Sequence, residues 1–137
     1  MPEESTTPDL VELVQRFFDA RNAGNIDAAM NLCASDIVWE GRTQTFEGHA
    51  ALRGFLQDWL DAFDEYEVAG EEIRDLGNGV TFNVLIQRGR PRGSAGWVQY
   101  RQGVVTTWID GLVRRVTFYP DIDEARAAAE RLAQERG

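Results

Sequence analysis

The stretch that decides the fold is residues 96–119, GWVQYRQGVVTTWIDGLVRRVTFY, in which Asp110-Gly111 joins two β-rich runs. An Asp-Gly pair between such runs predicts a tight antiparallel hairpin, because the turn needs positive φ and glycine adopts it at low cost. Strands of this length twist and curl. Because a curled sheet can wrap around helices and leave a hollow, we expect any ligand or chemistry inside that hollow.

Upstream of this hairpin, the sequence predicts two further strands. Residues 66–76 are typical of an edge strand, residues 77–79 (Gly-Asn-Gly) of a hairpin turn, and residues 80–88 of a strand with a period of two. The arginine-rich segment 89–94 is expected to be a flexible hairpin loop. Simple amphipathicity predicts that Val80, Phe82, Val84 and Ile86 face the core.

Helical spacing of apolar residues dominates the first half of the chain. Thr7-Pro8-Asp9 is typical of a helix start, and Gly24 is expected to end that helix. A short helix over residues 26–33, capped by Asn25, and a longer one over residues 49–63 are expected next, with a brief strand at 37–40 between them. Asp121 and Glu124 predict a capping box for a closing helix. This order predicts an α+β domain with helices on one face of a sheet.

Length and composition predict one domain over residues 1–137. The chain is 43% hydrophobic, which is enough for a core, and no break in composition suggests a second domain. Residues 1–7 are polar and acidic, so we expect them to be disordered rather than to act as a secretory signal. Because no apolar run is long enough to cross a membrane, a cytoplasmic location and no membrane partner are expected.

Charge and cysteine content narrow the function classes. A net charge of -9 argues against a nucleic-acid partner, although residues 76–120 carry six arginines and a single acid. All fourteen basic residues are arginine, which removes lysine Schiff-base chemistry. Cys33 is the only cysteine, so no internal disulfide or thiolate metal site is possible. With one histidine and no glycine-rich phosphate loop, we expect no metal and no cofactor.

Four short motifs give the chain a family resemblance: NAGNIDAA at 22–29, DIVWE at 36–40, FEGH at 46–49 and YPD at 119–121. With the order of elements, they make residues 9–130 resemble the nuclear transport factor 2-like superfamily, and within it the SnoaL-like and ketosteroid-isomerase-like groups. The resemblance implies a cone-shaped, curved antiparallel sheet wrapped around three N-terminal helices, with a C-terminal helix. It also implies a small-molecule pocket and a homodimer formed through the outer sheet face.

The residues that carry the best-known activity of these groups are absent from this chain. The isomerase uses a carboxylate base, a tyrosine and a protonated acid, and the resemblance aligns these positions with Gly41, Phe17 and Val104. Family epoxide hydrolases use acids on the last long strands, where this chain has Phe118. Both activities are therefore disfavoured.

Three residues could still carry acid/base chemistry. Glu40 follows Trp39, so a bulge could turn its carboxylate into an apolar pocket and raise its pKa, whereas strict alternation would point it outwards, where Arg42 could pair with it. His49, the only histidine, is either a general acid or base or a surface residue of a first helical turn. Tyr100 could donate a hydrogen bond to a ligand oxygen, or it could only help to position the sheet.

Further residues are expected to bind the ligand. They are aromatic or polar side chains on the faces that the resemblance turns inward, namely Phe17, Trp39, Trp59, Asn83, Gln102, Trp108 and Arg114. Arg114 either meets an acidic ligand on the inner face or lies on the outer face in water. The resemblance turns Asn83 inward, against the amphipathic pattern, and the two agree if a second subunit covers the apolar outer face.

The sequence leaves two hypotheses for function. The first is a pocket protein that binds a small hydrophobic ligand carrying an acidic or carbonyl group and acts as a cofactor-free isomerase, cyclase or hydratase/hydrolase. The second is a noncatalytic ligand-binding or dimerisation module that keeps the pocket without the family acids.

Overall fold

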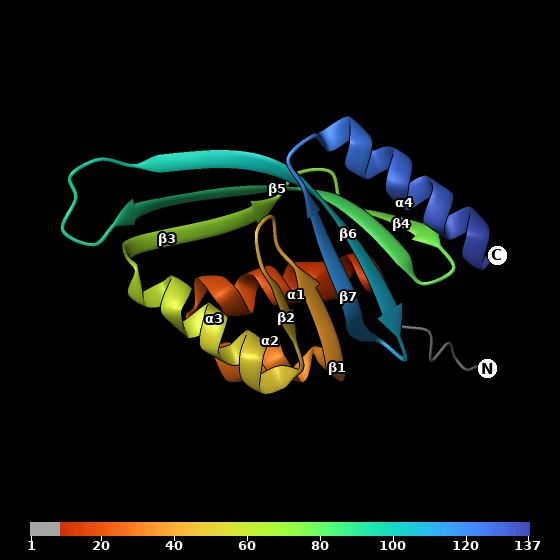
Figure 1. The fold of residues 1–137 in the computed structure, drawn as a ribbon, viewed down its shortest axis with the longest axis horizontal. Helices are drawn as coiled ribbons and strands as arrows, with labels where there is room; N and C mark the ends of the chain where they lie inside the picture. Colours follow the sequence, from red (N-terminus) through yellow and green to blue (C-terminus); the bar gives the residue numbers. More distant parts are fainter. Residues whose placement is uncertain (1–8) are drawn as a thin grey trace.

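The computed structural model describes residues 9–137 (Figure 1). Its helices are α1 (Leu10–Asn22), α2 (Ile26–Asn31), α3 (His49–Asp61) and α4 (Ile122–Arg136). Its strands are β1 (Cys33–Glu40), β2 (Thr45–Glu47), β3 (Phe63–Gly70), β4 (Arg74–Gly77), β5 (Val80–Pro91), β6 (Val98–Ile109) and β7 (Leu112–Tyr119). The expected disorder of residues 1–7 lies outside the described residues. None of the described helices is both long and apolar enough to cross a membrane.

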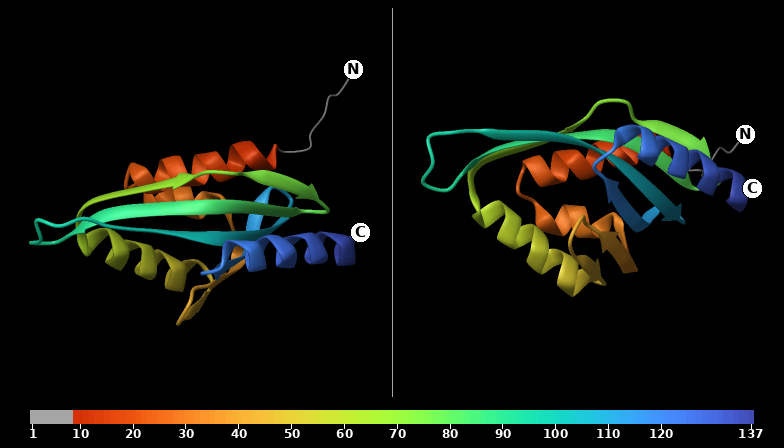
Figure 2. Two further views of the ribbon diagram at one scale, coloured as in Figure 1. Left: turned by 90° about the horizontal axis from the view of Figure 1, so that it is seen from above. Right: turned by 45° about the horizontal axis from the view of Figure 1, so that its top comes forward.

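One curved sheet of seven strands runs through the molecule in the order β2-β1-β7-β6-β5-β3, with β4 also paired to β5. The curvature is clear in both views of Figure 2, where the sheet bends around the N-terminal helices. The α+β cone expected from the sequence is confirmed. One detail differs, because β1 pairs with β7 in parallel rather than antiparallel register.

The deciding hairpin forms as the sequence predicts. β6 and β7 pair in antiparallel register, and the turn between them has positive φ at Asp110 (51°) and Gly111 (77°). The Gly77-Asn78-Gly79 turn also forms, with positive φ at all three residues. The expected edge strand over 66–76 is instead two strands, β3 and β4, both of which pair with β5.

The helix boundaries follow local capping groups. The side chain of Asp9 accepts a hydrogen bond from the Glu12 amide and so caps α1, which begins at Leu10. Thr7 and Pro8 of the expected helix start lie outside the described residues. Asn25 caps α2 as expected, but the helix ends at Asn31 because β1 already begins at Cys33. Asp121 caps α4 by accepting from the amide of Glu124. The short strand β2 was not expected.

The two faces of the sheet are covered by different helices. Helices α1, α2 and α3 pack inside the curve, whereas α4 crosses the opposite side (Figures 1 and 2). The expectation that all helices share one face is therefore wrong. Outer-face residues Val80, Phe82, Val84 and Val105 form a separate core with three alanines of α4. This helix of the same chain, rather than a second subunit, resolves the conflict over which face of β5 is buried.

The uneven charge along the sequence is balanced across neighbouring strands. Arginines of β5 and β6 pair with acids of β3 or the turn after it, as in Arg88–Glu67, Arg90–Glu65 and Arg101–Glu71. These pairs are mostly exposed and therefore contribute little to stability. Of the six arginines of residues 76–120, five have a carboxylate oxygen within 4.0 Å.

Candidate functional site

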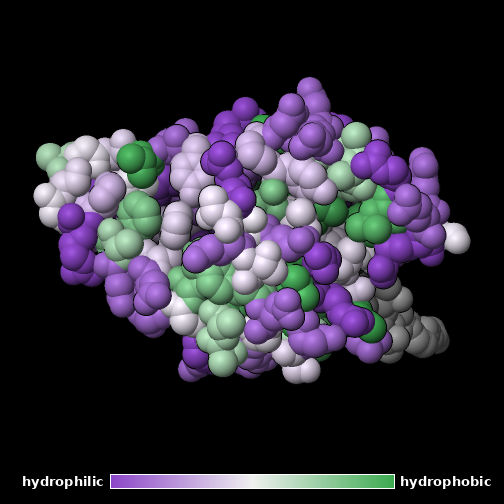
Figure 3. All heavy atoms as spheres, in the orientation of Figure 1, coloured by the Kyte–Doolittle hydropathy of each residue, from purple (hydrophilic) through white to green (hydrophobic). Residues whose placement is uncertain are grey.

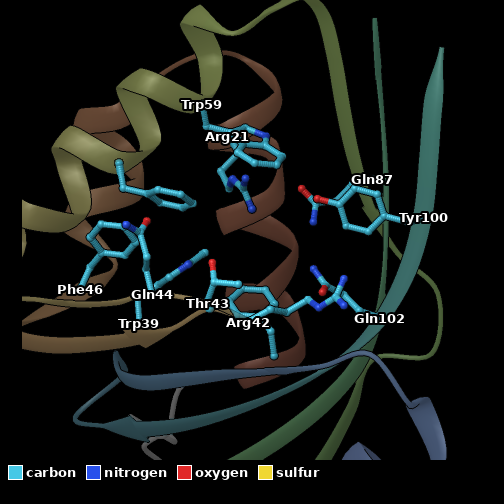
Figure 4. A pocket seen from close by; sticks show the side chains of 13 residues that line it. Arg21, Trp39, Arg42, Thr43, Gln44, Phe46, Trp59, Gln87, Tyr100 and Gln102 are labelled. Carbon is cyan, nitrogen blue, oxygen red and sulfur yellow. The ribbon is translucent and has the colours of Figure 1, made fainter. Parts of the chain in front are cut away.

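A cavity of about 250 Å³ opens between α3, the β1–β2 connection and the ends of β5 and β6 (Figure 4). We call it the outer cavity. It is lined by Arg21, Trp39, Gly41, Arg42, Thr43, Gln44, Phe46, Phe55, Trp59, Gln87, Tyr100, Gln102 and Phe118.

One wall of the outer cavity is aromatic. Helix α3 contributes Phe55 and Trp59 four residues apart, so helical periodicity places both on the same face. Phe46 of β2 stacks on Phe55 with ring centroids 4.5 Å apart, and Trp39 of β1 lies 6.3 Å from the same ring. This arrangement gives flat apolar surfaces against which a planar ligand can pack.

The opposite wall is polar. Gln87 of β5 and Gln102 of β6 are buried, and Tyr100 is 38% exposed at the mouth. Figure 4 shows these three side chains facing the aromatic wall across the cavity. Burial raises the pKa of Tyr100, and the charges of Arg21 and Arg42 oppose that shift. The phenol is therefore protonated at neutral pH and can donate a hydrogen bond.

Arg21, in the last turn of α1, is buried between the two walls. Its Nη2 donates to the Tyr66 hydroxyl at 2.8 Å, and that hydroxyl donates to Oε1 of Gln87 at 2.5 Å. The guanidinium also lies over the rings of Trp39 and Tyr66, at 5.8 and 5.5 Å from their centroids. Burial raises the pKa of Tyr66, and Arg21 opposes the shift. In this network the charged guanidinium of Arg21 is therefore hydrogen-bonded to neutral side chains alone, directly to Tyr66 and through it to Gln87.

A second, smaller cavity of about 40 Å³ lies deeper in the cone. This inner cavity shares Arg21, Trp39 and Phe118 with the outer one. Asn83 lines it and is only 2% exposed, and its Nδ2 has no hydrogen-bond partner among the described residues. An unpaired buried donor costs free energy, so this amide is suited to an acceptor atom that enters the cavity.

The residues that the family resemblance aligns with the isomerase and epoxide hydrolase positions all line the cavities. Gly41 lines the outer cavity, Phe17 and Val104 line the inner one, and Phe118 lines both. No aspartate, glutamate or histidine belongs to either lining within residues 9–137. In the same range, no group of His, Cys, Asp or Glu side chains could hold a metal ion.

Glu40 and His49 lie outside the cavity linings. Glu40 alternates with Trp39 along β1, and its Oε1 accepts hydrogen bonds from Arg115 Nε at 3.0 Å and Thr117 Oγ1 at 2.9 Å. Its partner is thus Arg115 rather than Arg42. His49, in the first turn of α3, has Nε2 2.9 Å from the carbonyl oxygen of Cys33. That Glu40 or His49 transfers a proton remains a prediction.

Arg114, which was expected among the ligand-binding residues, lines neither cavity. Thr107 pairs with Arg115 and Trp108 pairs with Val113, so Arg114 is the extra residue of a β-bulge in β7. The bulge points Arg114 outwards, where its half-exposed guanidinium pairs with Asp36 at 3.2 Å. Val113 and Val116 take the inner face instead.

Of the expected ligand-binding residues, Trp39, Trp59 and Gln102 line the outer cavity. Phe17, Asn83 and Trp108 line the inner one, where Trp39 also contributes. The indole N–H of Trp108 is already paired with Thr81 Oγ1 at 2.9 Å, so this tryptophan offers only its ring.

The expected ligand-binding residues do not include Arg21, Arg42, Phe46, Phe55 and Gln87, all of which line the outer cavity. Arg21 could have been noticed, because it falls on the apolar stripe of α1 four residues after Phe17. Arg42 lies in an irregular connection, which has no periodicity from which to infer direction.

The fold and the site define a class of protein, a cone-shaped α+β domain with a small-molecule cavity at its open end. The model of the SnoaL-like domain family matches residues 14–116, so the chain belongs to this family. A nuclear transport factor 2-like protein from Exiguobacterium shares its fold, with a TM-score of 0.71 and 15% identity over 80% of this chain and 98% of that one. A comparison with curated proteins gives no match.

Three further solved structures share the fold. A hypothetical protein with a ketosteroid isomerase-like fold from Catenulispora acidiphila, in complex with trimethylamine, has a TM-score of 0.73 and 15% identity over 90% of this chain and 94% of that one. TerC, co-crystallised with polyporic acid, has a TM-score of 0.71 and 15% identity over 89% and 98%. A candidate polyketide cyclase from Xanthomonas campestris has a TM-score of 0.66 and 24% identity over 86% and 94%.

Proposed function

We propose that this protein binds a small hydrophobic molecule carrying an oxygen function in the outer cavity. The observation that carries this proposal is the pairing of an aromatic wall with a polar wall across about 250 Å³ of open space. Such cavities bind ligands by apolar contact and orient them with a few polar groups. The small molecules named for two structures of the same fold, polyporic acid and trimethylamine, support binding at this scale.

Within this proposal, Tyr100 and Gln102 orient the ligand oxygen. The Tyr100 hydroxyl makes no hydrogen bond with another of the described residues, and Gln102 is only 6% exposed on the same face of β6. A protonated phenol and an amide N–H can both donate to a carbonyl oxygen. If the protein converts the ligand chemically, these donors would stabilise the negative charge that develops on the ligand oxygen during the reaction.

The binding proposal can be tested by closing the mouth. Thr43 is exposed and lines the outer cavity, whereas Thr45 is exposed two residues away and does not. Thr43→Trp should abolish ligand co-purification seen by native mass spectrometry, while Thr45→Trp keeps it. Equal ligand occupancy in both variants would contradict the outer cavity as the site.

The catalytic form of the proposal is cofactor-free acid/base chemistry of the isomerase, cyclase or hydratase/hydrolase type. Tyr100 is the group that polarises the substrate, and Glu40 or His49 is the proposed proton carrier. Glu40→Gln, His49→Gln and Tyr100→Phe, measured one at a time in a turnover assay, test these roles. Unchanged rates in all three variants would reject this catalytic site.

A second candidate function is noncatalytic ligand binding or dimerisation. The observation that favours it is the lack of any acid or histidine in the cavity linings of residues 9–137. This form of the proposal predicts a tightly held ligand that is recovered unchanged.

We also propose a homodimer and a cytoplasmic location. The part of the outer sheet face that α4 leaves uncovered is available for the dimer. Figure 3 shows one face of the molecule, which is mainly hydrophilic with small separate hydrophobic areas. Sedimentation velocity would test the dimer, because a monomer at all protein concentrations would contradict it.

A further inference from the structure

The buried guanidinium of Arg21 has no carboxylate partner. Nine other arginines of residues 9–137 have a carboxylate oxygen within 4.0 Å, from Arg16–Glu12 to Arg126–Glu72. Arg21 has none within this distance, although it is the one arginine of that range whose side chain is buried. Most of the arginines that are exposed or half-buried therefore have a counter-charge, whereas the arginine that is removed from water has none. A buried charge without a partner is costly unless something else compensates it.

Most of the hydrogen-bonding capacity of Arg21 is unused. A guanidinium has five N–H donors in a planar fork, and within the described residues only Nη2 makes a hydrogen bond, to Tyr66. Because Arg21 lines both cavities, the rest of the fork is available to whatever enters them. A fork of this kind matches the two oxygens of a carboxylate.

A second arginine adds to the positive charge at the mouth. Arg42 is exposed, lines the outer cavity and has no carboxylate within 4.0 Å among the described residues. Both Arg21 and Arg42 act on the pKa of Tyr100, which shows that the two charges reach the same space. The cavity is thus positive in a chain whose net charge is -9.

From this geometry we infer that the ligand is a planar aromatic acid that binds as its carboxylate, with the anionic group on Arg21 and the ring against the aromatic wall. The inference rests on the proposed function and narrows its ligand class. The anion would supply the counter-charge that the fold withholds, and Trp59, Phe55 and Phe46 would hold the ring. A neutral ligand of the same shape would leave Arg21 unpaired and would bind more weakly.

Matched pairs of acids and amides test the charge requirement. The probes are benzoate, 2-naphthoate and 2-anthroate, each with its neutral carboxamide, titrated into the full-length protein by calorimetry at pH 7. Within each pair the ring is the same, and a neutral NH2 group replaces one oxygen of the charged carboxylate. We expect the preferred acid to bind at least tenfold more tightly than its amide.

Two variants remove the unpaired positive charge in different ways. Arg21→Met deletes the charge. Gln87→Glu keeps Arg21 and adds a carboxylate to the network, which can still accept the Tyr66 hydrogen bond. We therefore expect this variant to keep the fold and to supply Arg21 with a counter-charge from within the protein. Arg53→Gln is the control, since Arg53 pairs with Asp27 on the surface and lines neither cavity. Thermal melts establish that each variant is folded.

The expected result is that the preference for acid over amide falls to about onefold in Arg21→Met and Gln87→Glu and is kept in Arg53→Gln. If acid and amide bind the parent protein equally, the anion inference is wrong and the proposed binding function stands. A preference that survives Gln87→Glu would also overturn the inference, because the charge would then act elsewhere. If none of the six probes binds, the inference is wrong, and the proposed function is then decided by the comparison of Thr43→Trp with Thr45→Trp.

Discussion

The two faces of strands β5 and β6 are both buried but are built differently. On the outer face, Val80, Phe82 and Val84 pack closely against alanines of α4. On the inner face, Asn83, Gln87 and Gln102 are buried around open space. The difference shows that the more apolar face of a strand need not be the one that faces the functional interior. Close packing stabilises the fold on the outer face. On the inner face, polar groups without a partner, such as the amide of Asn83, can hydrogen-bond to a ligand.

The largest effect is expected where the outer face is tightest. A Cβ atom built on Gly103 would lie 2.3 Å from the Cβ of Ala125, so Gly103→Val should push α4 off the sheet and cost about 3 kcal/mol of unfolding free energy. Urea denaturation measures the loss. Gly54→Ala is the control, because nothing lies near that position on α3, and it should stabilise the protein by about 0.5 kcal/mol. Equal stability of the Gly103 variant and the parent would break the contrast between the faces.

A change on the inner face should have the opposite sign. Asn83→Leu removes an unpaired buried donor, and the inner cavity beside it can take the added volume, so we expect a gain of about 1 kcal/mol in urea denaturation. Asn22→Leu is matched to it, because the Asn22 amide makes two hydrogen bonds of 2.8 Å to the backbone of Val68 and should lose about 1 kcal/mol. A loss in both variants would mean that Asn83 is satisfied in solution.

The pH dependence of stability sharpens the comparison at the core beneath the inner face. Burial raises the pKa of the Cys33 thiol to about 12, from an ordinary value of 9.0. Above pH 9 the unfolded chain loses this proton while the folded one keeps it, so the stability present below pH 9 falls as the pH rises towards 12. The limiting slope is about 1.4 kcal/mol per pH unit for one proton.

Cys33→Ala should flatten that slope between pH 9 and 10.5, as measured by urea denaturation at each pH. Only the slopes are compared, because the smaller side chain also leaves a void that acts equally at every pH. Identical slopes in the variant and the parent would indicate that the thiol is reached by water in the folded state.

The smallest effect is expected at Glu40, which contacts Arg115 and Thr117 across β1 and β7. These groups are partly exposed, so Glu40→Gln should change the unfolding free energy by less than about 1 kcal/mol and leave the affinity for aromatic acids unchanged. Calorimetry with the preferred acid checks the second point. A marked change in affinity would show that Glu40 contributes to binding as well as to the proposed proton transfer.

The amino-acid sequence by itself determined the elements whose signals are local. The Asp110-Gly111 turn, the caps at Asn25 and Asp121, and the helix from His49 depend on short-range hydrogen bonds and backbone preferences that a few residues encode. The family motifs extended this local knowledge to the cone and its pocket, and Trp39, Gln102 and Tyr100 could be expected there.

Only the tertiary structure decided which side chains meet. The bulge at Arg114 shifts the alternation of β7 by one residue, and a shift of that kind reverses the face on which every later side chain lies. The partner of Arg21 is Tyr66, 45 residues away, and the cover of Val80 and Phe82 is a helix that begins at Ile122. Such long-range contacts are set by the packing of the whole sheet, because a strand's local pattern shows that two faces differ but not what each face will contact.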